Sequence, residues 1–407
     1  MNEIKVNLLD FAQQKIFSAL LSWHQDSKLK GIIKEITPIG NEDPALDYLL
    51  PGFIDAHVHI ESSMMLPSEF GRMAVKHGTI ASVSDPHEIA NVMGIKGIEF
   101  MLANSEKTPF HFFFGAPSCV PATPFETAGA SITADDINTL FASGKIKYLS
   151  EMMNFPGVLS RAEEVMSKLK LAQDYGFPID GHAPGLVGDD VLNYAQAGIS
   201  TDHECTTLDE AREKIAAGMK ILIREGSAAR DFADLHPLIS EFPDSVMFCS
   251  DDKHPDELAG GHINQLVSQA VALGHSVFDV LTCACLNPIE HYQLPLGTVQ
   301  KGQILDAVLV EDLGEFKIKT TWLAGEIAAQ AGQSLLPSIV EVPINCFKAK
   351  KPDRNSLRII VDIEKVDVEK ADAEQVKTGQ VRVIDVFEGK LFTREKLINI
   401  DQFQQSP

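Results

Sequence analysis

The residues of this chain best suited to chemistry are histidines and carboxylates that each lie at the end of a short apolar run. His57 and His59 stand two apart, and side chains at i and i+2 of a strand point to the same face, so both imidazoles can reach one cation. The remaining candidates end separate runs and are Glu151, His182, His203 and Asp251. Imidazole and carboxylate groups are common ligands of divalent metals. The set therefore predicts a site for two divalent cations.

Eight apolar runs supply these positions, and they alternate with amphipathic segments of helical period. The runs are FIDAHVHI, TIASVSD, FHFFFGA, IKYLSE, PIDGHA, ISTDHE, KILIRE and VMFCSD. Strands alternating with helices predict parallel βαβ units, and eight units over roughly 250 residues predict a closed (β/α)8 barrel. An open doubly wound sheet is the alternative, but no G-x-G-x-x-G turn follows the first run. In such a barrel the carboxyl ends of the strands meet at one mouth, where the six candidate ligands would converge.

The segments on either side of the barrel have a different pattern. Residues 1–48 are mixed and polar with short β-like pieces, and residues 293–335 contain short strands separated by glycine turns. We expect these two segments to form one small β domain that flanks an α/β barrel of residues 49–292. Residues 336–407 would form a further C-terminal extension.

The stretch SDPHEIAN follows the second apolar run and should also lie at the mouth. Asp85 and Glu88 are three residues apart, so the structural alternative is a capping box at a helix N-terminus. Such a box would still leave His87 facing the substrate. Asp85, His87, Glu88 and Asn91 are therefore candidates for substrate contact.

Two polar residues at the last two runs complete the candidate substrate-binding set. Arg224 ends the seventh run, and a glycine two residues later allows close backbone approach. It either contacts the substrate or forms a structural ion pair. Asp252 directly follows Asp251 at the end of the eighth run.

Bulk properties restrict the class of partner. The chain has 35 basic and 57 acidic residues and a net charge of -22, which argues against nucleic acid or an anionic membrane as a partner. No apolar run approaches the roughly 20 residues needed to cross a bilayer, and the first residues do not resemble a signal peptide. The six cysteines are scattered along the chain, which argues against a disulfide scaffold. We expect a cytoplasmic protein with a small-molecule substrate, and a homodimer because two-fold assemblies are common.

Several of these stretches resemble the adenine deaminase family of the amidohydrolase superfamily. The matching motifs, in the family's order over residues 48–265, are PGFIDAHVHIESSM, SDPHEIANVMG, EMMNFPGV, DGHAPGL, TDHE, REGSAAR and SDDKHPDEL. The resemblance implies a metal-dependent enzyme that hydrolyses adenine to hypoxanthine and ammonia, as in purine salvage. It also implies a binuclear divalent metal centre, with Mn²⁺ or Fe²⁺ favoured and Zn²⁺ as the other option.

The resemblance implies which ligands serve which metal. His57, His59 and Asp251 would bind one cation, and His182 and His203 would bind the other.

Two catalytic roles are also implied. Glu151 would bridge the two metals. A carboxylated Lys147, on the same strand and face, is the alternative bridge that spacing leaves open. Asp251 would take a proton from the attacking water and pass it to the leaving amine.

Two other functions remain open at this point. The first is an amidohydrolase acting on a cyclic amide or imide, which would share every metal ligand. The second is a non-catalytic homologue, because family members generally continue with a further C-terminal domain and we expect this chain to be shortened relative to them. All six ligand positions are filled, which favours an enzyme.

Overall fold

Each of the eight apolar runs contains a short strand in the computed structural model, which describes residues 2–26, 28–123, 125–344, 348–357 and 380–399. These strands are β5 (Phe53–Val58), β6 (Thr79–Ser84), β7 (His111–Phe114), β8 (Leu149–Met152), β9 (Ile179–Gly181), β10 (Thr201–Asp202), β11 (Lys220–Arg224) and β12 (Val246–Cys249). They are parallel within β5–β6–β7, β8–β9 and β10–β11–β12.

Further backbone contacts close these three groups into a ring. A parallel bridge between Ala116 and Leu149 joins the end of β7 to β8, and Ser200 N donates to Ile179 O at 2.9 Å between β9 and β10. A parallel bridge between Val58 and Asp251 brings the last strand back to the first. The predicted (β/α)8 barrel is therefore confirmed, and the open-sheet alternative is wrong because the bridge from Asp251, just after β12, to Val58 in β5 closes the ring.

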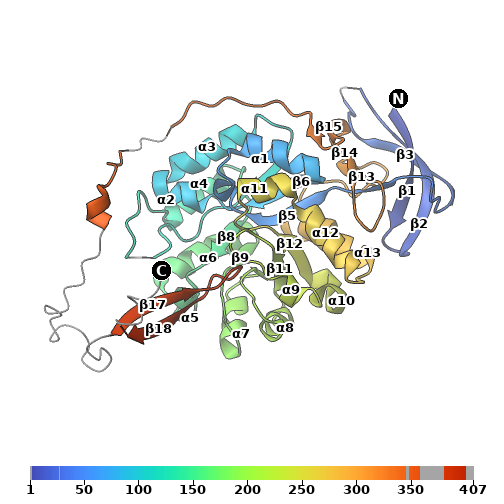
Figure 1. Ribbon diagram of the computed structural model, residues 1–407. Coiled ribbons are helices and arrows are strands. Elements are labelled where there is room, and N and C mark those ends of the chain that lie inside the picture. The colour runs from blue at the N-terminus through green and yellow to red at the C-terminus, as the bar shows by residue number, and fades with distance from the viewer. Residues whose placement is uncertain (1, 27, 124, 345–347, 358–379, 400–407) are drawn as a thin grey trace. The chain divides into compact units, whose positions relative to one another are not determined.

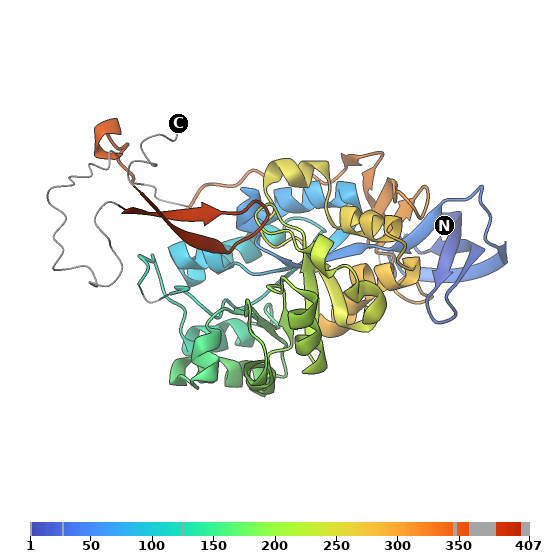
Figure 2. The ribbon, with the colours of Figure 1, turned by 60° about the horizontal axis from the view of Figure 1, so that its bottom comes forward.

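Helices surround the strands in both ribbon views (Figures 1 and 2). They are α1 (Pro67–Ala74), α2 (His87–Met93), α3 (Ile95–Ser105), α4 (Ala134–Ala142), α5 (Phe155–Leu159), α6 (Glu163–Tyr175), α7 (Asp189–Gln196), α8 (Leu208–Ala216), α9 (Phe232–Leu235), α10 (Leu238–Glu241), α11 (Pro255–Gly260), α12 (Ile263–Ala272), α13 (Val277–Leu281) and α14 (Asn287–Tyr292). Helix α12 illustrates the pattern, because Ile263, Leu266, Val267 and Ala270 are buried and recur at helical spacing. This spacing places one apolar stripe of the helix against the barrel.

An eight-stranded sheet combines segments from both sides of the barrel sequence. Its strand order is β16-β15-β14-β13-β4-β1-β2-β3. The first four in sequence are β1 (Asn2–Asp10), β2 (Lys15–Trp23), β3 (Ile33–Asn41) and β4 (Tyr48–Pro51), and the others are β13 (Ala307–Val310), β14 (Ile318–Leu323), β15 (Glu326–Gln330) and β16 (Gln333–Ser334). Strand β4 joins the halves by pairing with β1 and β13. Trp23 and Trp322 pack edge to face in its core, with ring centroids 6.4 Å apart.

The chain divides into two compact units, Met1–Ile339 and Val340–Pro407. In the second unit, β17 (Gln380–Val386) and β18 (Thr393–Asn399) form an antiparallel hairpin. The domain limits and the extension expected from the sequence stay a prediction, and much of the extension lies outside the described residues.

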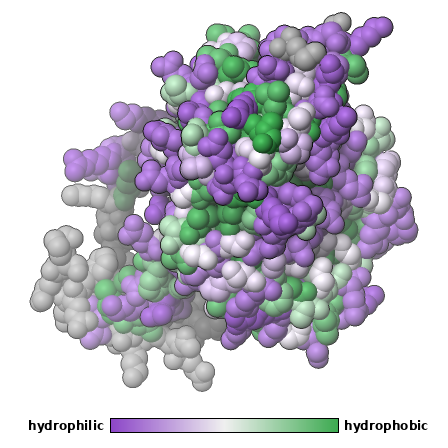
Figure 3. Space-filling view, turned by 90° about the vertical axis from the view of Figure 1, so that its right-hand side faces the viewer, coloured by the Kyte–Doolittle hydropathy of each residue, from purple (hydrophilic) through white to green (hydrophobic). Residues whose placement is uncertain are grey.

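Two further observations, one on the surface and one on the helices, bear on the class of protein. In the view of Figure 3, hydrophilic side chains surround separate small hydrophobic patches. Among the described residues, no helix combines the length and apolar character that crossing a bilayer requires.

Candidate metal centre and active site

The six predicted ligands lie together at the carboxyl ends of the barrel strands. Nε2 of His57, in β5, is 3.2 Å from Nε2 of His59, which follows that strand. Oδ1 of Asp251, which follows β12, lies 3.6 Å from the first nitrogen and 3.2 Å from the second. All three side chains are buried. They therefore direct two nitrogens and one oxygen toward a common point, as one metal site requires.

Glu151, in β8, lies between the two halves of the cluster. Its Oε1 is 3.2 Å from Nε2 of His59. Its Oε2 is 3.2 Å from Nε2 of His203, which follows β10, and 2.7 Å from Nδ1 of His182, which follows β9. Lys147 is exposed and precedes β8, so the structure does not bring it to this cluster. The carboxylate with one oxygen toward each half is the group placed to bridge two cations.

The protonation preferences and the donor atoms of the cluster are suited to binding cations. Burial, with His203 and His59 nearby, lowers the pKa of His57 well below its ordinary value. Burial opposes protonation of His59 as well, but Glu88, Asp251 and Glu151 raise its pKa well above the ordinary value. The pKa values of these two adjacent imidazoles are thus shifted in opposite directions, downward by burial and neighbouring histidines for His57 and upward by carboxylates for His59. A donor set of four imidazoles and two carboxylates suits Zn²⁺, Mn²⁺ or Fe²⁺, and such cations would supply the missing positive charge.

The backbone presents Asp251 in an unusual conformation. Its φ of 53° lies in the left-handed region, which costs free energy for a residue with a side chain. Hydrogen bonds to the first strand hold it there: Asp251 N donates to His57 O at 2.9 Å, and His59 N donates to Asp251 O at 3.2 Å. The same backbone bonds therefore fix three ligands relative to one another.

Arg224, at the end of β11, is turned toward carboxylates and is 2% exposed. Its Nη1 donates to Asp251 Oδ2 at 3.0 Å, and its Nη2 donates to Asp231 Oδ2 at 3.1 Å. The guanidinium also binds Glu204 through both terminal nitrogens. Of the two roles that the sequence left open for Arg224, this geometry favours the structural ion pair.

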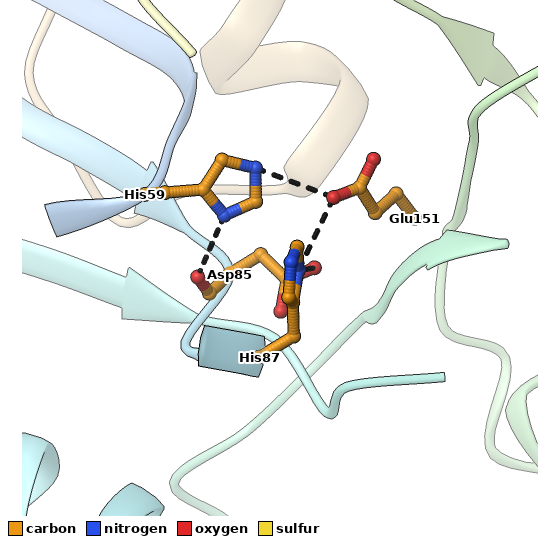
Figure 4. A group of neighbouring side chains, drawn as sticks. All are labelled: His59, Asp85, His87 and Glu151. Carbon is orange, nitrogen blue, oxygen red and sulfur yellow. Dashed lines mark hydrogen bonds and ion pairs between the residues drawn. The ribbon is translucent and has the colours of Figure 1, made fainter. Parts of the chain in front are cut away.

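The stretch predicted to contact the substrate begins helix α2 beside the metal ligands (Figure 4). Nδ1 of His87 lies 3.1 Å from Asp85 Oδ2 and 3.2 Å from Glu151 Oε1. Nδ1 of His59 lies 3.2 Å from the backbone oxygen of Asp85 and 3.2 Å from Oε1 of Glu88. The capping box, which was the structural alternative for this stretch, is absent, because Pro86 occupies the N-cap position and no side-chain cap bond forms. His87 and Glu88 thus contact two of the predicted metal ligands, Glu151 and His59, directly.

The other two predicted substrate-binding residues lie at the edge of this group. Asn91 is one turn further along α2, and its buried Oδ1 has no hydrogen-bond partner among the described residues. Asp252 is half-buried and accepts a hydrogen bond from Ser62. Burial, with Asp251 adjacent, raises the pKa of Asp252.

Two carboxylates of the site were missed by the sequence reasoning. Glu204 has its Oε1 3.6 Å from His182 Nδ1 and 3.6 Å from His203 Nε2, so it could ligate the second cation. Glu61 is half-buried beside Glu88, and burial together with that neighbour raises its pKa to about 8. Each lies one or two residues after a predicted histidine ligand, a position that could have marked it as a candidate.

Comparison with known sequences identifies relatives of the whole barrel. The family model described as the amidohydrolase family matches residues 48–328. An adenine deaminase from Salinibacter ruber is 52% identical over 320 residues, covering 79% of this chain and 58% of that protein. An adenine deaminase from Parabacteroides distasonis is 43% identical over 408 residues, covering 99% of this chain and 71% of that protein. This chain therefore spans between 58% and 71% of the length of these two relatives.

Solved structures of low sequence identity share the fold. An N-isopropylammelide isopropylaminohydrolase from Burkholderia multivorans superposes with a TM-score of 0.57 at 14% identity, over 82% of this chain and 100% of that chain. An N-acetyl-D-glucosamine-6-phosphate deacetylase from Mycobacterium smegmatis also gives a TM-score of 0.57 at 14% identity, over 81% and 100% of the two chains. At such identity the likeness supports the barrel architecture alone.

Proposed function

The chain belongs to the amidohydrolase family and, within it, to the adenine deaminase family, and from this membership we propose that it hydrolyses adenine to hypoxanthine and ammonia. The observation that carries the proposal is the cluster of six ligands at one barrel mouth, in a sequence 52% identical to an adenine deaminase across the barrel.

The proposal assigns the ligands to two divalent cations. His57, His59 and Asp251 would hold one cation, and His182 and His203 would hold the other. Glu151 would bridge the two. The distances from Glu151 to both groups of imidazoles support this division. Mn²⁺ or Fe²⁺ is the cation that we propose, with Zn²⁺ as the alternative that the same donor atoms accept.

Divalent cations held by these residues would supply Lewis acidity and would lower the pKa of a water toward neutrality. Asp251 takes one proton from the attacking water as the water oxygen adds to C6 of adenine. It then delivers the proton to the departing amino nitrogen, so that the C6–N bond breaks and ammonia leaves. The second water proton ends on N1 of the ring, which gives hypoxanthine. Arg224 keeps Asp251 oriented for both transfers through its bond to Oδ2.

Contact with the purine is assigned to Asp85, His87, Glu88, Asn91 and Asp252. Three buried oxygens in this group, one each on Asp85, Glu88 and Asn91, have no hydrogen-bond partner among the described residues. An unpaired buried polar atom costs about 1–3 kcal/mol. Adenine carries N–H donors on its amino group and on the ring, which would satisfy such acceptors. A site built on those bonds would reject an analogue that lacks them.

The setting proposed for this activity is a homodimer in a reducing cytoplasm. The cysteines at positions 119, 205, 249, 283 and 285 are free thiols and buried, which is consistent with a reducing compartment. The net charge of -22 favours a small molecule over nucleic acid as the partner.

The direct test is ammonia release from adenine by protein loaded with Mn²⁺, with metal content measured in the same sample. We expect turnover with two equivalents bound, and Glu151→Gln should lose both the second equivalent and activity. Hydrolysis of hydantoin or dihydroorotate without adenine turnover would instead indicate a cyclic amide hydrolase. A folded protein that binds no metal would indicate a non-catalytic homologue.

A further inference from the structure

One buried carboxylate binds both ends of the loop that carries Asp251. This loop, here called the β12 loop, runs from Ser250 to His262. Asp55, in β5, is fully buried and accepts hydrogen bonds from Ser250 N at 2.9 Å and from the Ser250 hydroxyl. Nε2 of His262 lies 2.7 Å from Oδ2 of the same carboxylate. Both ends of the β12 loop are therefore hydrogen-bonded to the same anchor, the carboxylate of Asp55.

The surroundings of His262 fix which nitrogen serves Asp55. The imidazole is 1% exposed, and its Nδ1 lies 2.8 Å from the hydroxyl oxygen of Thr79 at the start of β6. The ring packs edge to face on Phe70 at 5.7 Å. Because a carboxylate only accepts, Nε2 donates to Asp55 and Nδ1 accepts from the threonine hydroxyl. Loss of the imidazole would leave a buried carboxylate short of a donor, which is costly.

The Asp55 carboxylate also contacts the backbone of its own strand, β5, which leads to the first two ligands. Oδ1 of Asp55 accepts from the backbone N of His57 at 3.4 Å. The backbone of Asp251 is in turn bonded to His57 and His59. Asp55 thus links the backbone of β5 to both ends of the β12 loop, directly behind the metal ligands. Groups that orient metal ligands from behind typically change metal affinity 10–100-fold when they are replaced.

We propose that Asp55 and His262 are positioning residues that clamp the β12 loop and so hold Asp251 in its strained, metal-facing conformation. The inference rests on the proposed metal centre for its effect on cations, whereas the clamping of the loop itself does not require that a metal be bound.

Two amide substitutions at His262 test whether the hydrogen bond to Asp55, and not side-chain packing alone, holds the loop. In His262→Gln the amide nitrogen reaches the place of Nε2 and can still donate to Asp55. In His262→Asn the shorter amide reaches only the place of Nδ1. His275→Asn is the matched control, because His275 pairs with His236 and both lie in turns between helices, outside the metal centre. The measurements are the Kd for Mn²⁺ and hydrogen exchange of residues 251–261 in the metal-free protein.

We expect His262→Asn to weaken Mn²⁺ binding about tenfold or more and to speed exchange of the loop, since an orienting group is lost. His262→Gln and His275→Asn should stay within about threefold of the unaltered protein on both measures. Ser250→Ala removes one donor at the other end of the loop and should act in the direction of His262→Asn, so it serves if that variant does not fold. Equal effects of Gln and Asn at 262, or unchanged affinity and exchange in both His262→Asn and Ser250→Ala, would overturn the clamp.

The two proposals fail separately in this design. If the unaltered protein binds no Mn²⁺, the proposed function fails, and the exchange of residues 251–261 alone decides the clamp. If Mn²⁺ binds normally but the exchange rates of the variants are equal, only the clamp fails.

Discussion

Arg224 binds Asp251 through the oxygen that faces away from the paired histidines. Nη1 of Arg224 lies 3.0 Å from Oδ2 of Asp251, while Oδ1 lies 3.2 Å from Nε2 of His59. Asp231 and Glu204 hold the same guanidinium from other directions. The arginine therefore fixes the rotation of the carboxylate that would carry the proton.

Arg224→Lys should lower kcat for adenine by about a hundredfold, the loss typical of small misplacements at a reacting centre. A single ammonium cannot hold three carboxylates with the planar geometry of a guanidinium. Ammonia release at saturating adenine measures the effect, with Mn²⁺ content determined in parallel. Arg212→Lys, in an exposed pair with Glu241, is the matched control and should behave as the unaltered protein. Full activity of Arg224→Lys would show that the orientation of Asp251 does not depend on it.

Asp251→Asn should lower turnover by about 10²–10⁴-fold, because the amide cannot accept the water proton. The neighbouring Asp252→Asn provides the comparison, since it alters an adjacent carboxylate that is assigned to substrate contact and should raise KM more than it lowers kcat. Both variants are assayed for ammonia release after metal analysis. If Asp251→Asn keeps its metal and turns over within tenfold of the unaltered protein, another group carries the proton.

Chelation of metal should lower the thermal stability of the barrel, and added Mn²⁺ should restore it. The buried carboxylates of the cluster then lose the cations that would balance their charge, and the imidazole nitrogens lose their bonding partner. A ligand at a hundred times its Kd stabilises the folded state by about 2.7 kcal/mol, which is measurable as a shift in Tm. Glu151→Gln removes the bridge and should show a smaller shift with Mn²⁺. An identical shift in this variant would indicate that the cations bind elsewhere.

The decrease in the free energy of unfolding at acidic pH should depend on His291. Burial, with Lys220 nearby, lowers the pKa of His291 to about 4, whereas the unfolded chain has the ordinary value of 6.5. Between these values the unfolded chain binds a proton that the folded chain does not. The free energy of unfolding should therefore fall as pH drops from 6.5 to 4, by at most about 3 kcal/mol from this residue.

His291→Gln should flatten this part of the profile, as measured by urea unfolding at pH 6.5 and pH 4.5. His24→Gln, at the end of β2, is the control and should leave the slope unchanged. A variant at 291 with the slope of the unaltered protein would contradict the assignment.

The barrel was predictable because its signals are local. Short apolar runs separated by helical patterns fix the alternation of strands and helices, and a ligand at the end of a strand is visible as a polar residue after an apolar run. The convergence of Glu151 with the histidines then follows from the geometry of the fold. The structure agrees with that reasoning at each of the eight runs.

The features that the sequence did not reveal depend on contacts between distant residues. His262 directly precedes helix α12 and has no local mark of a role, yet it bonds to Asp55, 207 residues away in the chain. Arg224 was ambiguous because a cation at a strand end suits a substrate as well as an ion pair. Only the positions of Glu204 and Asp231 decide between them.

The pairing of β4 with β13 has a consequence for the order in which the protein is made. Pro51 lies opposite Ala307, so the partner of β4 is synthesised only after the entire barrel. At typical rates of translation the delay is on the order of 10 to 50 s. Through that interval the nascent chain carries a strand edge with unmet hydrogen bonds, which is a template for pairing with other chains. The growing polypeptide should therefore be most prone to aggregate before β13 emerges from the ribosome.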